Sequence, residues 1–531
     1  MVISLSRVLI SDEVDPKCVD ILQSHGVEVV TNTKLSKNEL IAEIPKYDGL
    51  IVRSATKVTA EVINAGKNLK IIGRAGTGVD NIDCQVATER GIIVMNTPGG
   101  NTLSAAEHTC ALIISLTRDL ARAAQSMKEE RWDRKAFMGI ELNGKTLAII
   151  GLGRIGREVA LRMQSFGMKT IGYDPIIGAE VAAEFNTEWL PLENLWPLAD
   201  FITVHTPLIP ATTNLINDDV FAKCKRGMCV INCARGGIID EAALLRALES
   251  GQCGGAGLDV FVEEPPKDYS LAKHPKVTAT PHLGASTREA QSRVAVEIAE
   301  QFIDLVQGKQ LFGAVNAPAL SNALSPESQP WVRLGENLGV LGSLLARDSV
   351  ASMHLTTIGT SLDKAGSYLS AAMLAGYLRS TRSGDADAPL NLINAPVLAK
   401  QAGLTVKMST QSQVSTTASI SVIFTTAGGQ SVQLAGSVAG GVPVLTEAQG
   451  ASFTVPASLS GPVLIFQAVP SPALLPSVIE AVTKNGASVI GLSLSQAVNA
   501  SVCGIINLSS ALANGLEALK TIVSSSNQAV L

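Results

Sequence analysis

Short apolar runs alternate with amphipathic segments along the first hundred residues. Helical spacing of apolar positions is found between the runs, as from Pro16 to Ser24 and from Ser36 to Ile44. The runs themselves are Arg7 to Ile10, Glu28 to Val30, Gly49 to Val52, Lys70 to Gly73 and Ile92 to Met95. A regular alternation of strand and helix predicts a parallel sheet covered by helices.

The same alternation returns after a long amphipathic segment, Leu103 to Arg131, which predicts a single helix. The later apolar runs are Leu147 to Ile150, Lys169 to Tyr173, Phe201 to Val204, Met228 to Asn232, Ala256 to Val260 and Val277 to Ala279. A helix is predicted from Ser286 to Val306 at the end of this part, and the segment from Leu311 to Ala317 connects it to the C-terminal half. We therefore expect two doubly wound parallel-sheet domains of Rossmann or flavodoxin type. Residues 101–285 would form one, inserted into the other, which combines residues 1–100 and 286–317.

Beyond Pro318 the pattern changes, because Ser, Ala, Thr and Val become frequent and charge becomes sparse after Lys407. Ile420 to Phe424 and Ser431 to Leu434 flank a glycine-bearing turn and predict a hairpin. From Gly461 the order is strand, helix, strand, strand, helix: Val463 to Ala468, Pro472 to Lys484, Ser488 to Ser495, Ala500 to Leu508 and Ala511 to Val523. We expect two smaller α+β domains here, residues 318–455 and 456–531.

A glycine-rich turn follows the apolar run that ends at Ile150. Gly151, Gly153 and Gly156 stand in G-x-G-x-x-G spacing, directly before a segment with helical spacing. In a dinucleotide-binding unit the first glycine permits the tight turn, the second lets pyrophosphate approach, and the third lets helix and strand pack closely. The N–H groups at the start of the helix would face the pyrophosphate.

Asp174 ends the next apolar run, where the adenosine ribose hydroxyls of a dinucleotide would lie. No Arg follows it to accept a 2′-phosphate, so the sequence favours NAD over NADP.

Composition limits the class of partner. The 531 residues carry a net charge of −5, which gives no reason to expect a nucleic acid or an anionic membrane. The eight cysteines form no C-x-x-C pair, so we predict buried thiols, no metal site and a reducing, cytoplasmic compartment. No targeting segment is evident, and polar residues interrupt the uncharged stretch between Lys484 and Glu517, which excludes a membrane span there.

Three loops that follow N-terminal apolar runs carry polar residues, and two of these loops carry an arginine. Arg53-Ser54, the segment from Arg74 to Asp80, and the segment from Asn96 to Asn101 all lie beyond the carboxyl ends of predicted strands. Ligands bind at that edge of a parallel sheet, and Arg beside glycine-rich backbone suits a small anion. Any one of these arginines alone is more typical of a solvated surface.

Three residues in later strand-end loops form a candidate catalytic set, namely Arg235, Glu264 and His282. Arg235 can bind a carboxylate and polarise a developing carbonyl, because it remains charged at all relevant pH. His282 can act as the general base in oxidation of a 2-hydroxy acid, and Glu264 can orient its ring.

These motifs resemble those of the D-isomer-specific 2-hydroxyacid dehydrogenases. The resemblance rests on GLGRIG at Gly151, NCARGGIID around Arg235, GLDVFVEEPP around Glu264 and PHLGAST at His282. It implies that Arg235 and His282 are catalytic, with Glu264 supporting the histidine. The residues that it places around NAD, together with the three glycines, are Thr77, Arg154, Ile155, Asp174, Thr206, Cys233, Ala234, Arg235, Asp259, His282, Leu283, Gly284 and Ala285.

The chain is most similar to the long members of this family that oxidise 3-phospho-D-glycerate to 3-phosphooxypyruvate, which opens a route to L-serine. The resemblance implies that the substrate phosphate is bound by Arg53, Ser54, Arg74 and Asn101. It also implies a homo-oligomer, either a tetramer or a dimer, in which Arg134 of a neighbouring subunit reaches the same phosphate. Long members end in an intervening domain and an ACT-like regulatory domain. The loop Val469 to Pro472 lacks the acidic, glycine-bearing character of an effector loop, so serine feedback is not expected from it.

Two alternatives share the same residues. Some members of the family act as NAD-sensing transcriptional co-repressors, and others reduce glyoxylate or hydroxypyruvate. The arginine-bearing loops and the long C-terminal half favour the phosphoglycerate enzyme.

Overall fold

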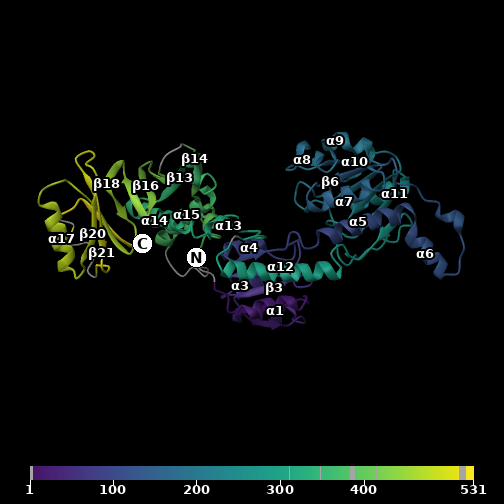
Figure 1. The fold of residues 1–531 in the computed structure, drawn as a ribbon, viewed down its shortest axis with the longest axis horizontal. Helices are drawn as coiled ribbons and strands as arrows, with labels where there is room; N and C mark the ends of the chain where they lie inside the picture. Colours follow the sequence, from purple (N-terminus) through teal and green to yellow (C-terminus); the bar gives the residue numbers. More distant parts are fainter. Residues whose placement is uncertain are drawn as a thin grey trace.

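The computed structural model describes residues 4–309, 311–346, 348–382, 389–412, 417–512, 519 and 522–531. Within these ranges the chain forms four sheets, which follow one another along the sequence and are here called the first to the fourth sheet. Figure 1 shows an elongated molecule with the first sheet in the middle, the second sheet at one end and the other two toward the opposite end. No helix in the described ranges is long and apolar enough to cross a membrane.

The first sheet is parallel, with strand order β2-β1-β3-β4-β5. Its strands are β1 (Arg7–Ile10), β2 (Glu28–Thr31), β3 (Gly49–Val52), β4 (Ile71–Arg74) and β5 (Ile93–Met95). The segments between them form α1 (Lys17–Ser24), α2 (Lys37–Glu43), η1 (Ile44–Lys46), α3 (Ala60–Ala65) and α4 (Cys84–Glu89). This confirms the strand–helix alternation predicted for the first hundred residues.

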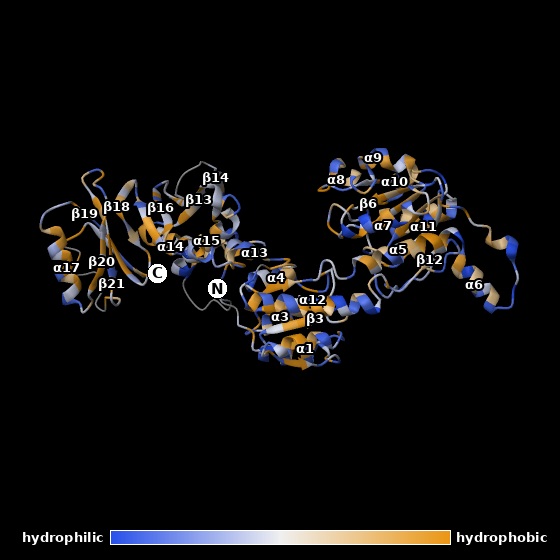
Figure 2. Cartoon of the chain, in the orientation of Figure 1, coloured by the Kyte–Doolittle hydropathy of each residue, from blue (hydrophilic) through white to orange (hydrophobic). Residues whose placement is uncertain are grey.

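A helix from much later in the chain completes the core of the first sheet. Phe302 of α12 (Arg288–Val306) is fully buried and lies so close to β4 that a Cβ on Gly73 would meet its ring at 2.5 Å. Figure 2 shows the apolar strand β3 beside α12, which alternates hydrophobic and hydrophilic residues. The chain therefore returns to the first sheet after leaving it, as the sequence predicted.

The second sheet is also parallel, with strand order β12-β11-β10-β9-β6-β7-β8. Its strands are β6 (Thr146–Ile150), β7 (Lys169–Tyr173), β8 (Glu188–Trp189), β9 (Phe201–Val204), β10 (Met228–Asn232), β11 (Cys253–Leu258) and β12 (Val277–Ala279). Its helices are α7 (Arg154–Gln164), α8 (Ala179–Ala183), α9 (Leu192–Leu195), η3 (Trp196–Leu198), α10 (Asp218–Lys223) and α11 (Glu241–Ser250). Strand order reverses between β6 and β9, and such a switch point is where doubly wound sheets bind ligands.

The prediction of a single long helix from Leu103 to Arg131 is wrong, because the structure has two helices there, α5 (Thr102–Thr117) and α6 (Leu120–Lys128). Asp119 adopts a left-handed conformation with φ of 48° between them. The returning chain donates from Ile140 N to the Thr117 carbonyl (3.0 Å), an oxygen that a continuing helix would need for its own next turn. Residues 119–139, with α6 and the turn η2 (Arg134–Phe137), therefore form an arm that extends away from the second sheet (Figure 1).

The third sheet is mixed, with strand order β14-β13-β15-β16-β17-β18 and a parallel pairing only between β13 and β14 among the described strands. Its strands are β13 (Val350–Ile358), β14 (Thr405–Gln411), β15 (Ser419–Thr426), β16 (Ser431–Ala439), β17 (Val442–Ala448) and β18 (Ala451–Ser458). Its helices are α13 (Leu320–Ala323), α14 (Gln329–Leu345), η4 (Thr360–Leu362), α15 (Gly366–Thr381) and α16 (Ala395–Gln401). The hairpin predicted around residues 427–430 is confirmed by β15 and β16.

The fourth sheet is antiparallel, with strand order β20-β21-β19-β22. It contains β19 (Pro462–Ala468), α17 (Leu474–Lys484), β20 (Val489–Leu494), β21 (Val502–Leu508) and β22 (Ser525–Val530). The strand β22 was not predicted, and most of the helix expected from Ala511 to Val523 lies outside the described residues. The two C-terminal sheets confirm an α+β half of the chain, whereas the ACT-like character of the last part stays a prediction.

Candidate active site

The glycine-rich turn joins β6 to α7 in the geometry that its spacing predicts. Gly151 has φ of +95°, and a Cβ there would meet the His205 carbonyl oxygen at 2.5 Å. A Cβ on Gly156 would meet the Gly151 carbonyl oxygen at 2.0 Å, so α7 packs directly against the turn. Gly153 begins the helix without a side-chain cap, and a Cβ on it would meet nothing within 4 Å. The start of α7 is therefore open to a ligand.

Asp174 follows β7 and lies beside this turn. Its carboxylate accepts hydrogen bonds from the backbone N–H groups of Leu152 (2.9 Å), Ile176 (2.8 Å) and Ile177 (3.0 Å). These contacts hold the acid next to the second residue of the glycine-rich turn, where the ribose of a dinucleotide would lie.

These residues fit NAD on an observation independent of the motif. Thr206 lies in the loop that follows β9, and its Oγ1 is buried without a hydrogen-bond partner in the described part of the chain. Unpartnered buried hydroxyls are uncommon, because the lost hydrogen bond costs about 1–3 kcal/mol. The orphaned hydroxyl and the uncapped start of α7 face the switch point from adjacent strands, as a bound dinucleotide requires.

Glu264 and His282 form a close pair. His282 Nδ1 lies 2.6 Å from Glu264 Oε2, and the Phe261 N–H donates to Glu264 Oε1 (3.1 Å). Burial alone would raise the pKa of Glu264, but the hydrogen bonds from His282 and Phe261 hold it below its usual range. The carboxylate is therefore charged near neutral pH, and Nε2 is the ring nitrogen left to exchange a proton with a substrate.

Asp259 holds the turn that carries His282. The Asp259 carboxylate is almost fully buried and accepts hydrogen bonds from the N–H groups of Leu283 and Gly284 and from Thr280 Oγ1, at 2.6–2.7 Å. His108 Nε2 of α5 lies 3.2 Å from the same carboxylate. Burial opposes ionisation of Asp259, but these donors lower its pKa. The pairing fixes a turn in which His282 has φ of 54°.

Arg235 reaches across from the second sheet to a loop of the first. Its Nε donates to Asp80 Oδ2 (2.8 Å), and its Nη1 donates to the Ala234 carbonyl (2.6 Å). The Asn232 side chain bonds both the Ala234 N–H and the Arg235 carbonyl, which fixes the loop. The guanidinium thus lies between the two sheets.

Arg53 and Arg74 approach the same space from the first sheet. Arg74 donates from Nε to the Asn81 side chain (2.9 Å), which in turn donates to the Arg53 carbonyl (2.7 Å). Burial, together with repulsion from Arg235, lowers the pKa of Arg74 to about 10. Asn101 accepts from Thr77 Oγ1 (2.6 Å) beside them.

A cleft of about 1190 Å³ is lined by many of these groups. The predicted site residues that line it are Arg53, Ser54, Arg74, Thr77, Asn101, Ile155, Thr206, Cys233, Ala234, Arg235, Asp259, Glu264, His282, Gly284 and Ala285. Outside the lining, Gly151, Gly153 and Leu283 lie in adjoining turns, Arg154 and Gly156 in the first residues of α7, and Asp174 directly after β7. Arg134 is exposed on the arm and is not part of the cleft within this chain.

Two further groups in the lining are neutral near pH 7. Burial lowers the pKa of His205 to about 4, and its Nε2 lies 3.0 Å from Thr203 Oγ1. Burial raises the pKa of the Cys233 thiol to about 12, so this cysteine is not a nucleophile at neutral pH. The candidate base of the cleft is therefore His282.

Sequence reasoning missed Asp80 and His108 as site residues. Asp80 stands two residues after Gly78 in an arginine-bearing loop, and a lone carboxylate among arginines is the signal that identifies it. His108 lies on α5 with no motif around it, and only its contact with Asp259 reveals it.

Comparisons with known proteins agree with this geometry. Residues 110–284 match the family model of the D-isomer specific 2-hydroxyacid dehydrogenase, NAD binding domain. Residues 327–446 match the model of the D-3-phosphoglycerate dehydrogenase intervening domain.

Two curated relatives are similar over nearly all of the chain. D-3-phosphoglycerate dehydrogenase of Rattus norvegicus is 52% identical over 530 residues, which cover 99% of both chains. The protein of the same name from Sus scrofa is 56% identical over 481 residues, which cover 90% of both.

Solved structures are similar over the N-terminal part. A glyoxylate reductase from Paecilomyes thermophila aligns with a TM-score of 0.55 and 28% identity, covering 59% of this chain and 99% of that one. A D-lactate dehydrogenase from Aquifex aeolicus, complexed with NAD and lactic acid, aligns with a TM-score of 0.50 and 29% identity, covering 57% and 96%.

Proposed function

The chain belongs to the D-isomer specific 2-hydroxyacid dehydrogenases and, within them, to the D-3-phosphoglycerate dehydrogenases, and from this premise we propose that its cleft oxidises 3-phospho-D-glycerate to 3-phosphooxypyruvate with NAD. One observation carries the substrate assignment. Two arginines from the first sheet, Arg53 and Arg74, meet an arginine and a Glu–His pair from the second sheet in a single cleft. A molecule with a phosphate at one end and a 2-hydroxy acid at the other matches this arrangement.

In the reaction, Arg235 binds the substrate carboxylate and His282 acts as general base. His282 Nε2 takes the proton of the C2 hydroxyl while the C2–O bond becomes a carbonyl. Glu264 holds the ring through Nδ1 and stabilises the imidazolium that forms. Arg235 also polarises the developing carbonyl oxygen. When bound, NAD accepts the hydride that leaves C2.

The phosphate of the substrate is assigned to Arg53, Ser54, Arg74 and Asn101 at the first-sheet wall. Arg74 is partly buried and already ordered by Asn81, so its guanidinium is pre-organised for an anion. A phosphomonoester carries close to two negative charges near pH 7, which offsets the repulsion between these arginines.

NAD is assigned to the second-sheet wall. Gly151, Gly153, Arg154, Ile155 and Gly156 would hold the pyrophosphate, and Asp174 the ribose. The remaining residues assigned to the cofactor are Thr77, Thr206, Cys233, Ala234, Arg235, Asp259, His282, Leu283, Gly284 and Ala285.

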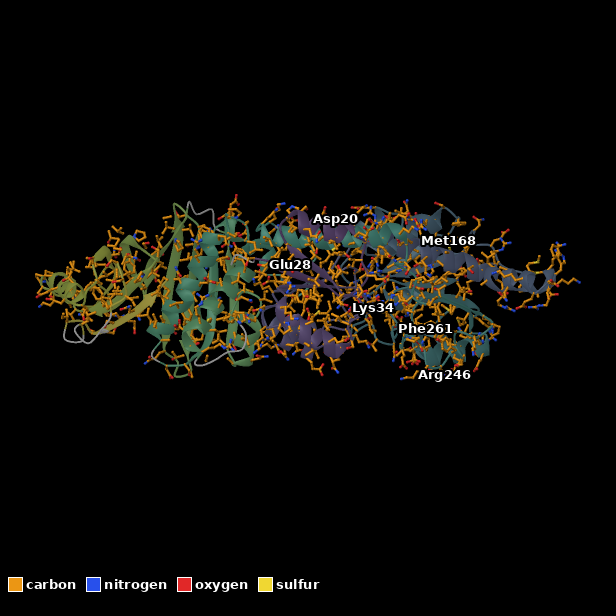
Figure 3. The ribbon with its side chains drawn as sticks, turned by 90° about the horizontal axis from the view of Figure 1, so that it is seen from below. Asp20, Glu28, Lys34, Met168, Arg246 and Phe261 are labelled. Carbon is orange, nitrogen blue, oxygen red and sulfur yellow. The ribbon has the colours of Figure 1, made fainter. Side chains whose placement is uncertain are left out.

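The exposed arm supports a homo-oligomer, either tetramer or dimer. It carries the exposed apolar side chains of Met127, Trp132 and Met138, and in Figure 3 the arm forms the end of the molecule, beyond Met168 and Arg246. Apolar groups grouped in this way are typical of a contact surface. Such a contact would bring Arg134 of the partner subunit to the phosphate.

The division of the chain follows the order of the sheets, although its last boundary falls inside β18 (Ala451–Ser458). We assign residues 1–100 and 286–317 to a substrate-binding domain, 101–285 to an NAD-binding domain, 318–455 to an intervening domain and 456–531 to an ACT-like domain. The product feeds synthesis of L-serine, and the free thiols fit the cytoplasm.

Steady-state kinetics test the function. Turnover of 3-phosphoglycerate, glycerate, lactate and malate is compared, each with NAD and with NADP. We expect the highest kcat/KM for 3-phosphoglycerate with NAD. Equal or faster turnover of glycerate would instead favour a hydroxypyruvate or glyoxylate reductase, and NAD binding without turnover would favour a co-repressor.

A further inference from the structure

The ion pair between Asp80 and Arg235 connects the two walls of the cleft. Arg235 Nε donates to Asp80 Oδ2 over 2.8 Å, although the residues stand 155 positions apart in the chain. Among the ion pairs of the described residues, it is the one that joins a loop of the first sheet to a loop of the second. Its position at the substrate end of the cleft links it to chemistry and not only to packing.

The contacts of Arg235 leave one edge of its guanidinium for a ligand. Asp80 takes the Nε–H, and the Ala234 carbonyl takes one hydrogen of Nη1. Nη2 lies against Gly78 so closely that a Cβ there would approach it to 1.7 Å. The second hydrogen of Nη1 and both hydrogens of Nη2 make no hydrogen bond within the described part of the chain, and the Nη1–Nη2 edge of a guanidinium can bind both oxygens of a carboxylate.

The positive charge of the three cleft arginines also requires a carboxylate at the position of Asp80. Arg53, Arg74 and Arg235 converge on the cleft, and without a nearby carboxylate they repel one another. Two other acids lie near them: Asp12 is bound by the N–H groups of Arg53 and Thr56, and Glu264, whose pKa the Arg235 charge also lowers, is bound by His282. Asp80 is therefore the acid that offsets the charge of Arg235 directly. Burial alone would raise the pKa of Asp80, but the Arg235 charge and hydrogen bond lower it and keep the group ionised.

We propose that Asp80 is the positioning residue of Arg235, holding its Nε so that the free Nη edge meets the substrate carboxylate. Because Asp80 belongs to the first sheet and Arg235 to the second, the arginine takes its working position only when the two walls stand together. The inference rests on the proposed function, since it requires Arg235 to bind a carboxylate.

A double-mutant cycle tests the coupling. Asp80→Ala should lower kcat/KM on the order of 10–10²-fold, for phosphorylated and unphosphorylated 2-hydroxy acids alike, because both share the carboxylate. The affinity for NAD, measured by titration calorimetry, should be unchanged. In an Arg235→Ala background, Asp80→Ala should cost less than about twofold more. Losses that simply multiply would overturn the proposal.

A matched control is Asp218→Asn, which breaks an Asp–Arg pair with Arg246 far from the cleft. It should leave kcat/KM within about twofold of the wild type, since exposed pairs contribute little. A loss as large as that of Asp80→Ala would show a general effect of removing an ion pair and would overturn the proposal.

Rescue by acetate distinguishes a positioning role of Asp80 from a merely structural one. In Asp80→Ala, acetate can occupy the space of the missing carboxylate and should raise kcat/KM several-fold. In the wild type it can only compete with substrate and should lower kcat/KM. Inhibition of both proteins to the same extent would overturn the proposal.

The activity of the wild type separates failure of the proposed function from failure of this inference. If the wild type turns over no 2-hydroxy acid, the proposed function itself fails. If the wild type is active and Asp80→Ala is equally active, only the inference fails.

Discussion

At the residue scale, the arginines of the cleft separate by the substrate group that each would bind. Arg53 and Arg74 come from the first sheet and are assigned to the phosphate, whereas Arg235 comes from the second sheet and is assigned to the carboxylate. Charged hydrogen bonds to a phosphate are worth about 1.5–3 kcal/mol each. Single substitutions should therefore distinguish the two groups of the substrate.

Arg53→Ala should lower kcat/KM for 3-phosphoglycerate by ~10–10²-fold and leave an unphosphorylated 2-hydroxy acid nearly unchanged. Arg235→Ala should harm both substrates alike. The exposed Arg246→Ala provides the control and should harm neither. Equal losses on both substrates for Arg53→Ala would mean that the phosphate lies elsewhere in the cleft.

Glu264→Gln tests the Glu–His pair. The charge of Glu264 complements the positive charge that develops on the His282 ring as the ring takes the substrate proton. Without that charge the proton transfer is less favourable, so kcat should fall, by at most the ~10²–10⁴-fold that general acid–base catalysis contributes, while the affinity for NAD is unchanged. Steady-state kinetics and NAD titration measure this. Full activity in Glu264→Gln would assign Glu264 a purely structural role.

At the element scale, both parallel sheets anchor their central strands by the same contacts. Asp48 precedes β3 and accepts from the Arg7 N–H at the start of β1, while its other oxygen pairs with Lys70. Asp200 precedes β9 and accepts from the Thr146 N–H at the start of β6, while its other oxygen pairs with Lys225. In each sheet one carboxylate thus joins two adjacent strands at the edge opposite the cleft.

The Asp200 carboxylate should stabilise the second sheet in a pH-dependent way. Burial would raise its pKa, but the Thr146 N–H and Lys225 lower it, so the stabilisation exists above the ordinary pKa of an aspartate and disappears as pH falls through the lowered value. Asp200→Asn should therefore lower the melting temperature by about 2–4 °C near pH 7 and by less near pH 3. Thermal melts at both pH values measure this. A difference that grows in acid would contradict the assignment.

The sequence predicts buried elements well because their apolar runs are local signals. The strands β3, β9 and β10 begin and end where their apolar runs do. The strand β22 has no such signal, since SSNQAV is mostly polar and is held by pairing with β19.

The same distinction applies to the site. The glycine-rich turn and the Glu–His pair follow from motifs, because each motif belongs to a short segment or to adjacent strand ends. The contacts of Asp80 with Arg235 and of His108 with Asp259 span 155 and 151 positions, and only the packed fold brings those residues together.

At the scale of the whole molecule, the second sheet and the C-terminal half lie on different sides of the first sheet (Figure 1). Every residue that lines the cleft stands between positions 53 and 286. Instead, α16 and the segment before it contact the end of α4, where Asn391 donates to the Gly91 carbonyl (2.8 Å) and Gln401 donates to Glu89 (3.0 Å).

A chain that ends at residue 317 should therefore keep the reaction. We expect kcat/KM for 3-phosphoglycerate within about tenfold of the full chain. Solubility should be lower, because removal of Leu320 and Ala323 uncovers part of the apolar cluster to which Leu305 and Ala317 belong. Kinetics and NAD titration of the purified truncated protein test this. Loss of NAD binding in a folded truncated protein would show that the C-terminal half supports the cleft directly.

The division of the cleft between two sheets has a consequence for the order in which molecules arrive. The residues assigned to NAD belong almost entirely to the second sheet, so the cofactor can bind to one wall, whereas the substrate needs Arg53 from one wall and Arg235 from the other. A substrate bound first would bridge the two walls between which the nucleotide must enter. We therefore expect a compulsory sequence, with the nucleotide entering first and leaving last. Product-inhibition kinetics would show NADH competing with NAD, and 3-phosphooxypyruvate not competing with NAD.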